Sequence, residues 1–245
     1  MAATFGFGEA RAADLGISPP SNRLFVSGEA AAGGMVRSQV ALGYGRPHQA
    51  WSGAEVWGLT FSTFGSVGAS LRGKLPFIDA NIGIRQTWAY QFGRLPPEEH
   101  HRGVDDSGAQ NRYVAIDAGV TLYAPAPYGY AFVWADLTLP DIPNDAHIYE
   151  EHLRAIVGRG ASWAVRPTYL FATNESRLSF GPMLEYVRLG GRRAGMWRVG
   201  GCVFYELSKR WDFGLVLTGA VSGPDELSLW DGMWGTGRFR YRWSL

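Results

Sequence analysis

The chain has 245 residues, of which only 18% are charged, and it is rich in glycine (33) and in aromatic residues (10 Trp, 11 Tyr and 13 Phe). This composition is too apolar for an intrinsically disordered chain, and 23 basic against 22 acidic residues leave no overall basic charge that would indicate a nucleic-acid partner. The single cysteine, Cys202, excludes an internal disulfide and a cysteine-built metal cage. No apolar stretch approaches the roughly 18 residues of a membrane-spanning helix. A membrane protein of this composition would therefore have to be a β-barrel.

Residues 1–21 are expected to form an N-terminal periplasmic segment, followed by a barrel over residues 22–245. The start of the chain has neither the basic region nor the apolar core of a signal peptide. A location in the outer membrane therefore requires that a leader peptide has been removed. Segment 1–21 ends near the breakers Pro19 and Pro20, and it could insert into the lumen or bind a periplasmic partner.

Twelve strand-like segments follow in chain order. The alternation of apolar and polar residues is weak in the first four, which are 22–33, 35–45, 54–62 and 65–75. It is clearer in the next eight, where it indicates strands with two different faces: 78–91, 113–122, 131–139, 162–171, 177–186, 197–207, 211–222 and 237–245. Because residues 22–75 could also form two long strands, a barrel of ten strands is the alternative.

The last segment shows which face the barrel would turn outward. Phe239, Tyr241 and Trp243 alternate there with Arg238 and Arg240. In a soluble barrel or sandwich, which is the alternative fold, the outward face should be rich in Lys and Glu. Here the polar face consists mostly of Gly, Ser, Thr, Asp and Arg with almost no Lys, which is typical of a lipid-facing wall around a wet lumen.

Loop lengths and aromatic residues support this interpretation. Short turns at 73–77, 124–129, 173–176 and 207–211 alternate with longer connections at 92–111, 140–160, 189–195 and 222–233. Outer-membrane barrels have short periplasmic turns and longer extracellular loops. Trp and Tyr prefer the two membrane interfaces, and the alternation places two aromatic bands on the outward face: Trp88, Tyr90, Trp163, Tyr186 and Trp197 on the outer rim, and Tyr130, Tyr169, Tyr205, Trp211 and Trp243 on the periplasmic rim.

These features resemble the bacterial outer-membrane β-barrel proteins. The outward residues at every second position of the last strand are similar to the C-terminal signal that the barrel-insertion machinery reads: Phe239, Tyr241, Trp243 and Leu245. That class usually ends in Phe, whereas this chain ends in Leu. The resemblance covers residues 22–245 as an architecture. It implies an all-β, transmembrane, antiparallel up-and-down barrel of twelve strands, located in the bacterial outer membrane.

The inward-facing charges are the candidate site. The residues expected to line the pore are Arg85, Arg166, Arg198, Arg238, Arg240, Arg242, Asp79, Asp117, Asp136, Glu185 and Glu206. A water-filled bore with excess arginine would favour anions. If the arginines instead pair with the acids across a narrow lumen, they form an ionic plug that passes little. Bulky inward residues would narrow the bore further: Tyr113, Phe132, Trp134, Met183 and Phe204.

The longest outer loop contains a candidate helix, His147–Val157. Its apolar residues share one helical face, and Glu150 is placed to pair with Arg154. Such a helix could cap the mouth of the barrel or pack on its surface.

No enzymatic function is predicted. The five histidines, His48, His100, His101, His147 and His152, fall in turns and loops. None is therefore placed for the Ser/His pair that outer-membrane phospholipase and deacylase barrels carry on their lipid face. A looser similarity to the omptin proteases, which use two acids facing an Asp–His pair, rests on Asp105 with Asp106 and on Asp145 with His147. Omptins have ten strands with the acids near strand ends, whereas these residues lie within loops.

No metal or cofactor is predicted. Glu98, Glu99, His100 and His101 carry metal-binding side chains, but neighbouring residues on an irregular loop rarely converge on one ion. The glycines match neither a phosphate-binding loop nor a dinucleotide fingerprint. Cys202 is expected to be a buried structural thiol that faces the lumen.

The sequence thus predicts an outer-membrane barrel that forms a narrow, arginine-lined channel for small polar or anionic solutes, with the lipid bilayer as its surroundings. The first alternative is a non-conducting barrel that acts as a structural or docking component of a cell-envelope assembly and binds an envelope protein. The second is a hydrolase or protease whose residues lie in the loops.

Overall fold

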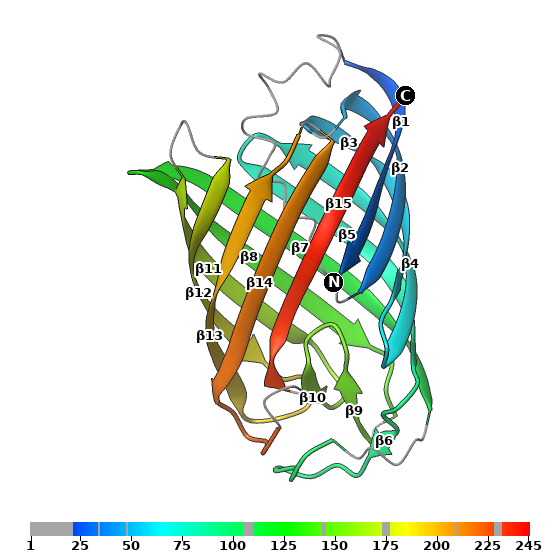
Figure 1. Cartoon of the computed structure of the whole chain (residues 1–245). Helices are drawn as coiled ribbons and strands as arrows, with labels where there is room; N and C mark the ends of the chain where they lie inside the picture. The colour runs from blue at the N-terminus through cyan, green and yellow to red at the C-terminus, as the bar shows by residue number, and fades with distance from the viewer. Residues whose placement is uncertain are drawn as a thin grey trace.

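The structure, a computed structural model, describes residues 22–33, 35–47, 49–104, 110–143, 146–172, 177–208, 210–227 and 232–245. Twelve antiparallel strands form a closed barrel in the order β1-β15-β14-β13-β12-β11-β8-β7-β5-β4-β3-β2 (Figure 1). Their bounds are β1 Arg23–Gly33, β2 Val36–Arg46, β3 Ala50–Thr60, β4 Phe64–Leu75, β5 Ile78–Ala89, β7 Asn111–Ala126, β8 Gly129–Pro140, β11 Ser162–Ala172, β12 Leu178–Arg188, β13 Gly195–Glu206, β14 Trp211–Ser222 and β15 Trp234–Ser244. The prediction of twelve strands is confirmed, and residues 23–75 form four strands rather than two.

The barrel closes where its first and last strands pair. Seven residues of β1 pair with β15, from Ser27 opposite Ser244 to Gly33 opposite Arg238. A Cβ atom at Gly28 would lie 2.6 Å from the indole ring of Trp243, so any larger residue there would require that ring to shift. Closure gives the backbone groups of both strands a partner, which an apolar environment requires.

The two faces of the wall differ as the alternation predicts. In β15, Phe239 is 44% exposed on the outside, whereas its neighbour Arg240 is 2% exposed inside. The same contrast runs around the barrel, and its exterior carries many exposed Leu, Ile, Val and aromatic side chains. A continuous apolar exterior of this kind is suited to lipid and not to water. The barrel has the architecture of a bacterial outer-membrane β-barrel protein.

Aromatic side chains form contacts at both ends of the strands. At the end with the long loops, the rings of Trp163 and Trp197 lie 5.4 and 4.8 Å from the ring of Tyr186. At the other end, the ring of Trp211 lies 4.6 Å from that of Tyr241. These contacts join neighbouring strands at the depths where a bilayer meets water.

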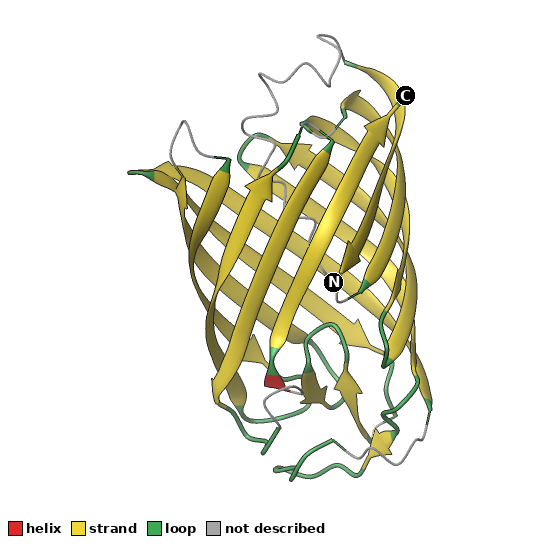
Figure 2. Ribbon diagram, viewed as in Figure 1, coloured by secondary structure: helices red, strands yellow, loops and turns green. Residues whose placement is uncertain are grey.

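The described parts of the long connections, which span residues 90–110, 141–161, 189–194 and 223–233, lie at the end of the barrel opposite the C-terminus (Figure 1). Within them, a second sheet has the order β10-β9-β6, with β6 Arg94–Leu95, β9 His147–Glu150 and β10 Ala155–Val157. Figure 2 shows this sheet at the same end of the barrel. We call residues 147–157, which form the β9–β10 hairpin, the plug.

The predicted helix over His147–Val157 is therefore wrong. Ala155, Ile156 and Val157 pair with β9 as a hairpin, and Arg154 has a positive φ of 53° in the turn. Ile148 and Ile156 are both buried, so this segment has no solvent face for a surface helix to present. No helix in the described part of the chain is long and apolar enough to cross a membrane.

Candidate functional site

One side of the lumen is filled by a network of buried ion pairs. The carboxylate of Glu185 on β12 accepts hydrogen bonds from Nε of Arg166 at 2.7 Å and from Nη1 of Arg198 at 3.1 Å. Arg166 also donates to Asp136 on β8, and Thr218 on β14 donates to Glu185 at 3.2 Å. Side chains of five strands thus meet at one buried carboxylate and its partners.

A second ion-pair cluster joins the wall to the plug. Arg85 on β5 donates to Asp117 on β7 through Nε at 2.7 Å, and to Glu150 in the plug through Nη2 at 2.9 Å. The hydroxyl of Tyr113 also donates to Glu150, at 3.0 Å. The predicted pairing of Glu150 with Arg154 is wrong, because the hairpin turns Glu150 toward Arg85 while Arg154 pairs with Glu151 at 3.5 Å.

The plug is also fastened to three other strands of the wall. Arg198 on β13 donates to the carbonyl oxygen of Leu153 at 2.9 Å, and the indole nitrogen of Trp234 on β15 donates to the carbonyl oxygen of His152 at 2.9 Å. Ser66 on β4 is hydrogen bonded to the His152 ring at 3.0 Å. The plug is therefore held to the wall on several sides.

The buried carboxyl of Glu151 makes this attachment sensitive to pH. Burial raises the pKa of Glu151 from 4.5 to about 8, against the opposing effect of Arg154. Between these two values only the folded plug holds the proton, so its stability falls as the pH rises and is lowest above about 8. Hydrogen exchange of residues 147–157, corrected for the intrinsic rate, should be faster at about pH 9 than at about pH 6. The variant Glu151→Gln should lose this difference, whereas Glu226→Gln on an exposed loop should keep it.

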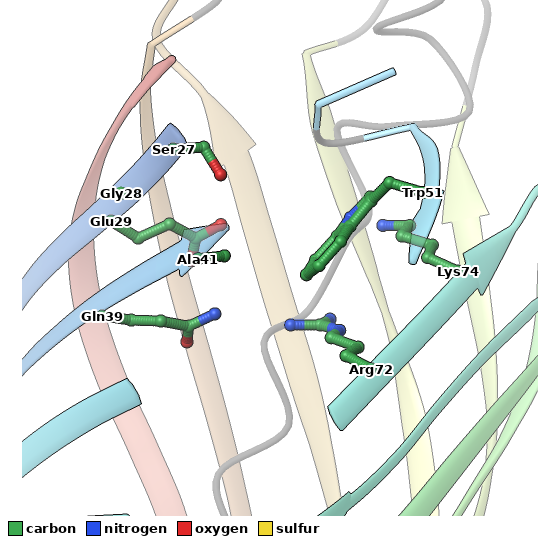
Figure 3. Close-up of a pocket in the computed structure, with 8 residues that line it drawn as sticks. All are labelled: Ser27, Gly28, Glu29, Gln39, Ala41, Trp51, Arg72 and Lys74. Carbon is green, nitrogen blue, oxygen red and sulfur yellow. The ribbon is translucent and has the colours of Figure 1, made fainter. Parts of the chain in front are cut away.

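The opposite side of the lumen contains two adjoining cavities. The first cavity lies nearer the C-terminal end of the barrel and is lined by Ser27, Gly28, Glu29, Gln39, Ala41, Trp51, Arg72 and Lys74 (Figure 3). In Figure 3, Glu29 and Gln39 point across it toward Trp51 and Arg72. The middle cavity shares Glu29 and Gln39 with the first, and its further lining residues are Ala31, Met35, Arg37, Thr236, Arg238 and Arg240.

These two cavities are narrow and basic. Each has a volume of about 20 Å³, and one water molecule needs about 10–15 Å³ on this measure. Their linings together contain five basic side chains, Arg37, Arg72, Lys74, Arg238 and Arg240, and one acidic side chain, Glu29. The side chains that line these two cavities are therefore mainly basic, and two of them, Arg72 and Arg240, pair with the acids Glu55, Asp79 and Asp212.

The structure places the predicted pore-lining residues in several different environments. Arg85, Arg166, Arg198, Asp117, Asp136 and Glu185 belong to the ion-pair clusters on the closed side. Arg238 and Arg240 line the middle cavity. Asp79 accepts from Arg72 at 2.8 Å, and Arg242 lies 3.3 Å from Asp212. Glu206 lies partly exposed at the end of β13.

Several residues around the cavities were not singled out by the sequence. Glu55 on β3 accepts from Gln39 at 2.6 Å and from Ser70 at 2.8 Å. Trp51 on β3 also belongs to this group, whereas Arg72 and Lys74, which complete that side, are inward-facing charges that the alternation predicts. The weak alternation of the first four strands hid this group, because small side chains such as Ser70 occupy inward positions where other strands have larger residues.

The loop residues considered for enzymatic or metal chemistry do not converge on a catalytic group in the described residues. His48, Asp105, Asp106 and Asp145 lie outside those residues. His101 and His147 are hydrogen bonded at 3.0 Å. Burial, together with Arg192, lowers the pKa of His147. No cluster of three or more potential metal ligands occurs among the described residues.

Cys202 is buried and faces the lumen, as predicted. It belongs to an apolar cluster that includes Phe132, Trp134, Met183 and Phe204. The four aromatic and methionine side chains were expected to narrow the bore, and they pack together inside the barrel.

Comparison with known proteins identifies no family for the chain. No protein-family model matches it, and no curated protein matches it. Among solved structures, it is similar to the NanC porin, with 10% identity over 91% of this chain and 98% of that one and a TM-score of 0.41. It is also similar to the Acinetobacter baumannii outer membrane protein Omp33 (11% identity, 92% and 99% coverage, TM-score 0.41). A third is CdiB from A. baumannii (9% identity, 93% and 60% coverage, TM-score 0.32).

Proposed function

We propose that the protein is a channel of the bacterial outer membrane that passes small anionic solutes. The observation that carries this proposal is the series of two adjoining cavities on one side of the lumen, with five basic side chains and one acidic side chain in their linings. Rings of Arg or Lys favour anions in narrow pores. The apolar exterior and the separation of long loops from short turns support the location in the outer membrane.

The proposed path follows β1, β2, β3, β4 and β15, and the ion-pair clusters on the other side keep the wall in shape. Because each cavity has room for only about one or two water molecules, the conductance should be small.

Single-channel recording in planar bilayers tests the proposal. The purified protein should give discrete openings, and under a KCl gradient the reversal potential should show that chloride passes more readily than potassium. A preference for potassium would contradict the proposal. A silent membrane that contains correctly folded protein would also contradict it.

A second candidate is a non-conducting barrel that serves an envelope assembly. The plug favours it, since its hairpin is fastened to β4, β5, β7, β13 and β15. A stoichiometric partner that co-purifies from native membranes, together with silent bilayers, would favour this candidate over the channel.

The variant Glu150→Gln probes how far the plug closes the barrel. It removes the charge that Arg85 holds at 2.9 Å, and breaking a buried pair in this way is strongly destabilising. We expect the plug to loosen and the conductance to rise above that of the unaltered protein. Glu226→Gln, on an exposed loop, is the matched control and should leave the conductance as it is. Equal conductance in Glu150→Gln and the unaltered protein would show that the plug does not limit the path.

A further inference from the structure

The barrel wall has a step beside the plug. The first four residues of β15, from Trp234 to Gly237, pair with β14, but the pairing between β1 and β15 ends with Gly33 opposite Arg238. Among the described residues, these four positions thus have no strand partner on the β1 side. Four residues of strand span roughly 14 Å, so β14 and β15 extend past the short β1–β2 hairpin by about that length.

A third cavity lies at this step and reaches both faces of the wall. Its lining includes Leu217 on β14, which is 41% exposed on the lipid-facing side, and Leu59 on β3, which is 5% exposed inside the barrel. Gly235 and Gly237 on β15 also line it and place no side chains there. The cavity therefore connects the apolar exterior with the interior of the barrel.

This third cavity differs from the other two in size and chemistry. Its volume is about 230 Å³, and an apolar cavity of about 150 Å³ is already large enough to bind benzene. Phe61 and Phe64 add to its apolar wall. A hydrocarbon chain of several methylene groups fits such a space.

Polar groups lie at one end of the third cavity. Glu151, His152 and Arg154 of the plug are part of its lining. Nη1 of Arg154 lies 3.5 Å from Oε2 of Glu151, and the Arg154 side chain is partly accessible. Its guanidinium group is therefore available to an anion in the cavity as well. Guanidinium groups pair well with carboxylates and phosphates.

We propose that the third cavity binds a single-chain portion of an anionic amphiphile, with its hydrocarbon chain toward Leu217 and the lipid and its anionic head toward Arg154. The site rests on the membrane placement of the barrel and not on ion conduction. The amphiphile is either a free fatty acid or an anionic lipid of the surrounding bilayer, which share this chemistry.

Photolabelling tests the site in the full chain, reconstituted in phosphatidylcholine nanodiscs. The first probe is a fatty acid with a diazirine in its chain, and the second is a phosphatidylglycerol with the same diazirine chain. At least one probe should label the peptides that contain Leu59, Phe64, Leu217 or Gly237, and excess unlabelled dodecanoate should compete. Labelling by the lipid alone would assign the site to the bilayer, and labelling by the fatty acid would assign it to free acids. Uniform labelling of the exterior that dodecanoate does not reduce would overturn the proposal.

Two glycine variants provide a matched comparison. A Cβ atom at Gly237 would lie 3.4 Å from its nearest neighbour, a Leu215 methyl group, and one at Gly219 on the same exterior would meet nothing within 4 Å. Both positions therefore tolerate a side chain. Gly237→Phe should block the third cavity and reduce labelling at least about tenfold, whereas Gly219→Phe should leave it unchanged. If Gly237→Phe does not fold, Leu59→Trp fills the cavity from inside.

The anionic head has its own test. Arg154→Gln should weaken labelling by the fatty acid about tenfold, the equivalent of one charge-assisted hydrogen bond. Labelling by an alcohol with the same diazirine chain should change little. Equal loss for the acid and the alcohol would show that Arg154 only shapes the plug and would overturn the assignment of the head. Photolabelling does not measure conductance. A negative labelling result would therefore overturn the binding site and leave the channel proposal untouched, and a silent bilayer would overturn the channel and leave the binding site untouched.

Discussion

Replacing Arg37 and Arg238 together by glutamate should abolish the preference of the channel for anions. Both side chains line the middle cavity. The basic side chains around the first and middle cavities would fall from five to three, and the acidic ones would rise from one to three. A unit charge about 10 Å from an ion contributes about 1.7 kcal/mol at an effective dielectric constant near 20. Reversing two charges should therefore lower the chloride-to-potassium permeability ratio by at least roughly tenfold.

The measurement is the reversal potential in planar bilayers under a KCl gradient. Arg112→Gln is the control, because Arg112 lies exposed on the exterior, where it donates to Gln86 at 3.1 Å, and its loss should leave the permeability ratio as it is. The single variant Arg238→Gln should give an intermediate ratio and is the fallback if the double variant does not fold. An unchanged ratio in the double variant would show that ions do not follow the proposed path.

Replacing Glu185 by alanine should have the largest effect on stability. Glu185 is fully buried and accepts from Arg166, Arg198 and Thr218. Removing it leaves the buried guanidinium groups of Arg166 and Arg198 without their shared carboxylate. Asp136 still pairs with Arg166. Breaking a buried pair of this kind costs about 3–5 kcal/mol of unfolding free energy.

Equilibrium unfolding in urea, followed by tryptophan fluorescence of the protein in detergent micelles, measures this loss. Glu226→Ala is the matched control, since its side chain is 67% exposed and lies 3.5 Å from His100, and surface changes stay within about 0.5 kcal/mol. The double variant Glu185→Leu, Arg198→Met removes one cation together with the anion, leaves Arg166 paired with Asp136, and should recover much of the loss. A loss of less than about 1 kcal/mol for Glu185→Ala would contradict the structural role given to this network.

The two sides of the lumen differ in how they are packed. The ion pairs around Glu185 and Arg85 tie wall strands to each other and to the plug. The cavities beside Arg37 and Arg72 remain on the other side. Of the two possibilities that the sequence left open, the buried ion pairs correspond to the ionic plug on one side of the lumen, and the arginine-lined bore on the other side remains our proposal.

The alternation of the chain determined most of the wall. A strand with period two has only two faces, so the aromatic residues at 239, 241 and 243 and the arginines at 238, 240 and 242 had to lie on opposite sides of the sheet. The contrast between the exposed Phe239 and the buried Arg240 follows from this rule. The strand count was less certain in residues 23–75, because small residues on both faces weaken the alternation there.

The fold of the plug could not be read in the same way. Residues 147–157 carry apolar side chains at helical spacing, yet they form a hairpin because the surrounding wall buries both of its faces and supplies partners for its polar groups. Arg85 on β5 and Glu150 in the plug are 65 positions apart in the chain, and no local pattern links them. Arg154 pairs with Glu151 and not with Glu150 because the hairpin turns Glu150 toward Arg85.

By itself, the sequence determined that this protein is a closed barrel with an apolar exterior and a charged interior, because side-chain alternation is a local property of each strand. Only the tertiary structure decided which charges neutralise one another, where space remains in the lumen, and that a step in the wall opens beside β15. These features depend on strand register and on loops that fold back into the barrel, and both bring together residues that lie far apart in the chain.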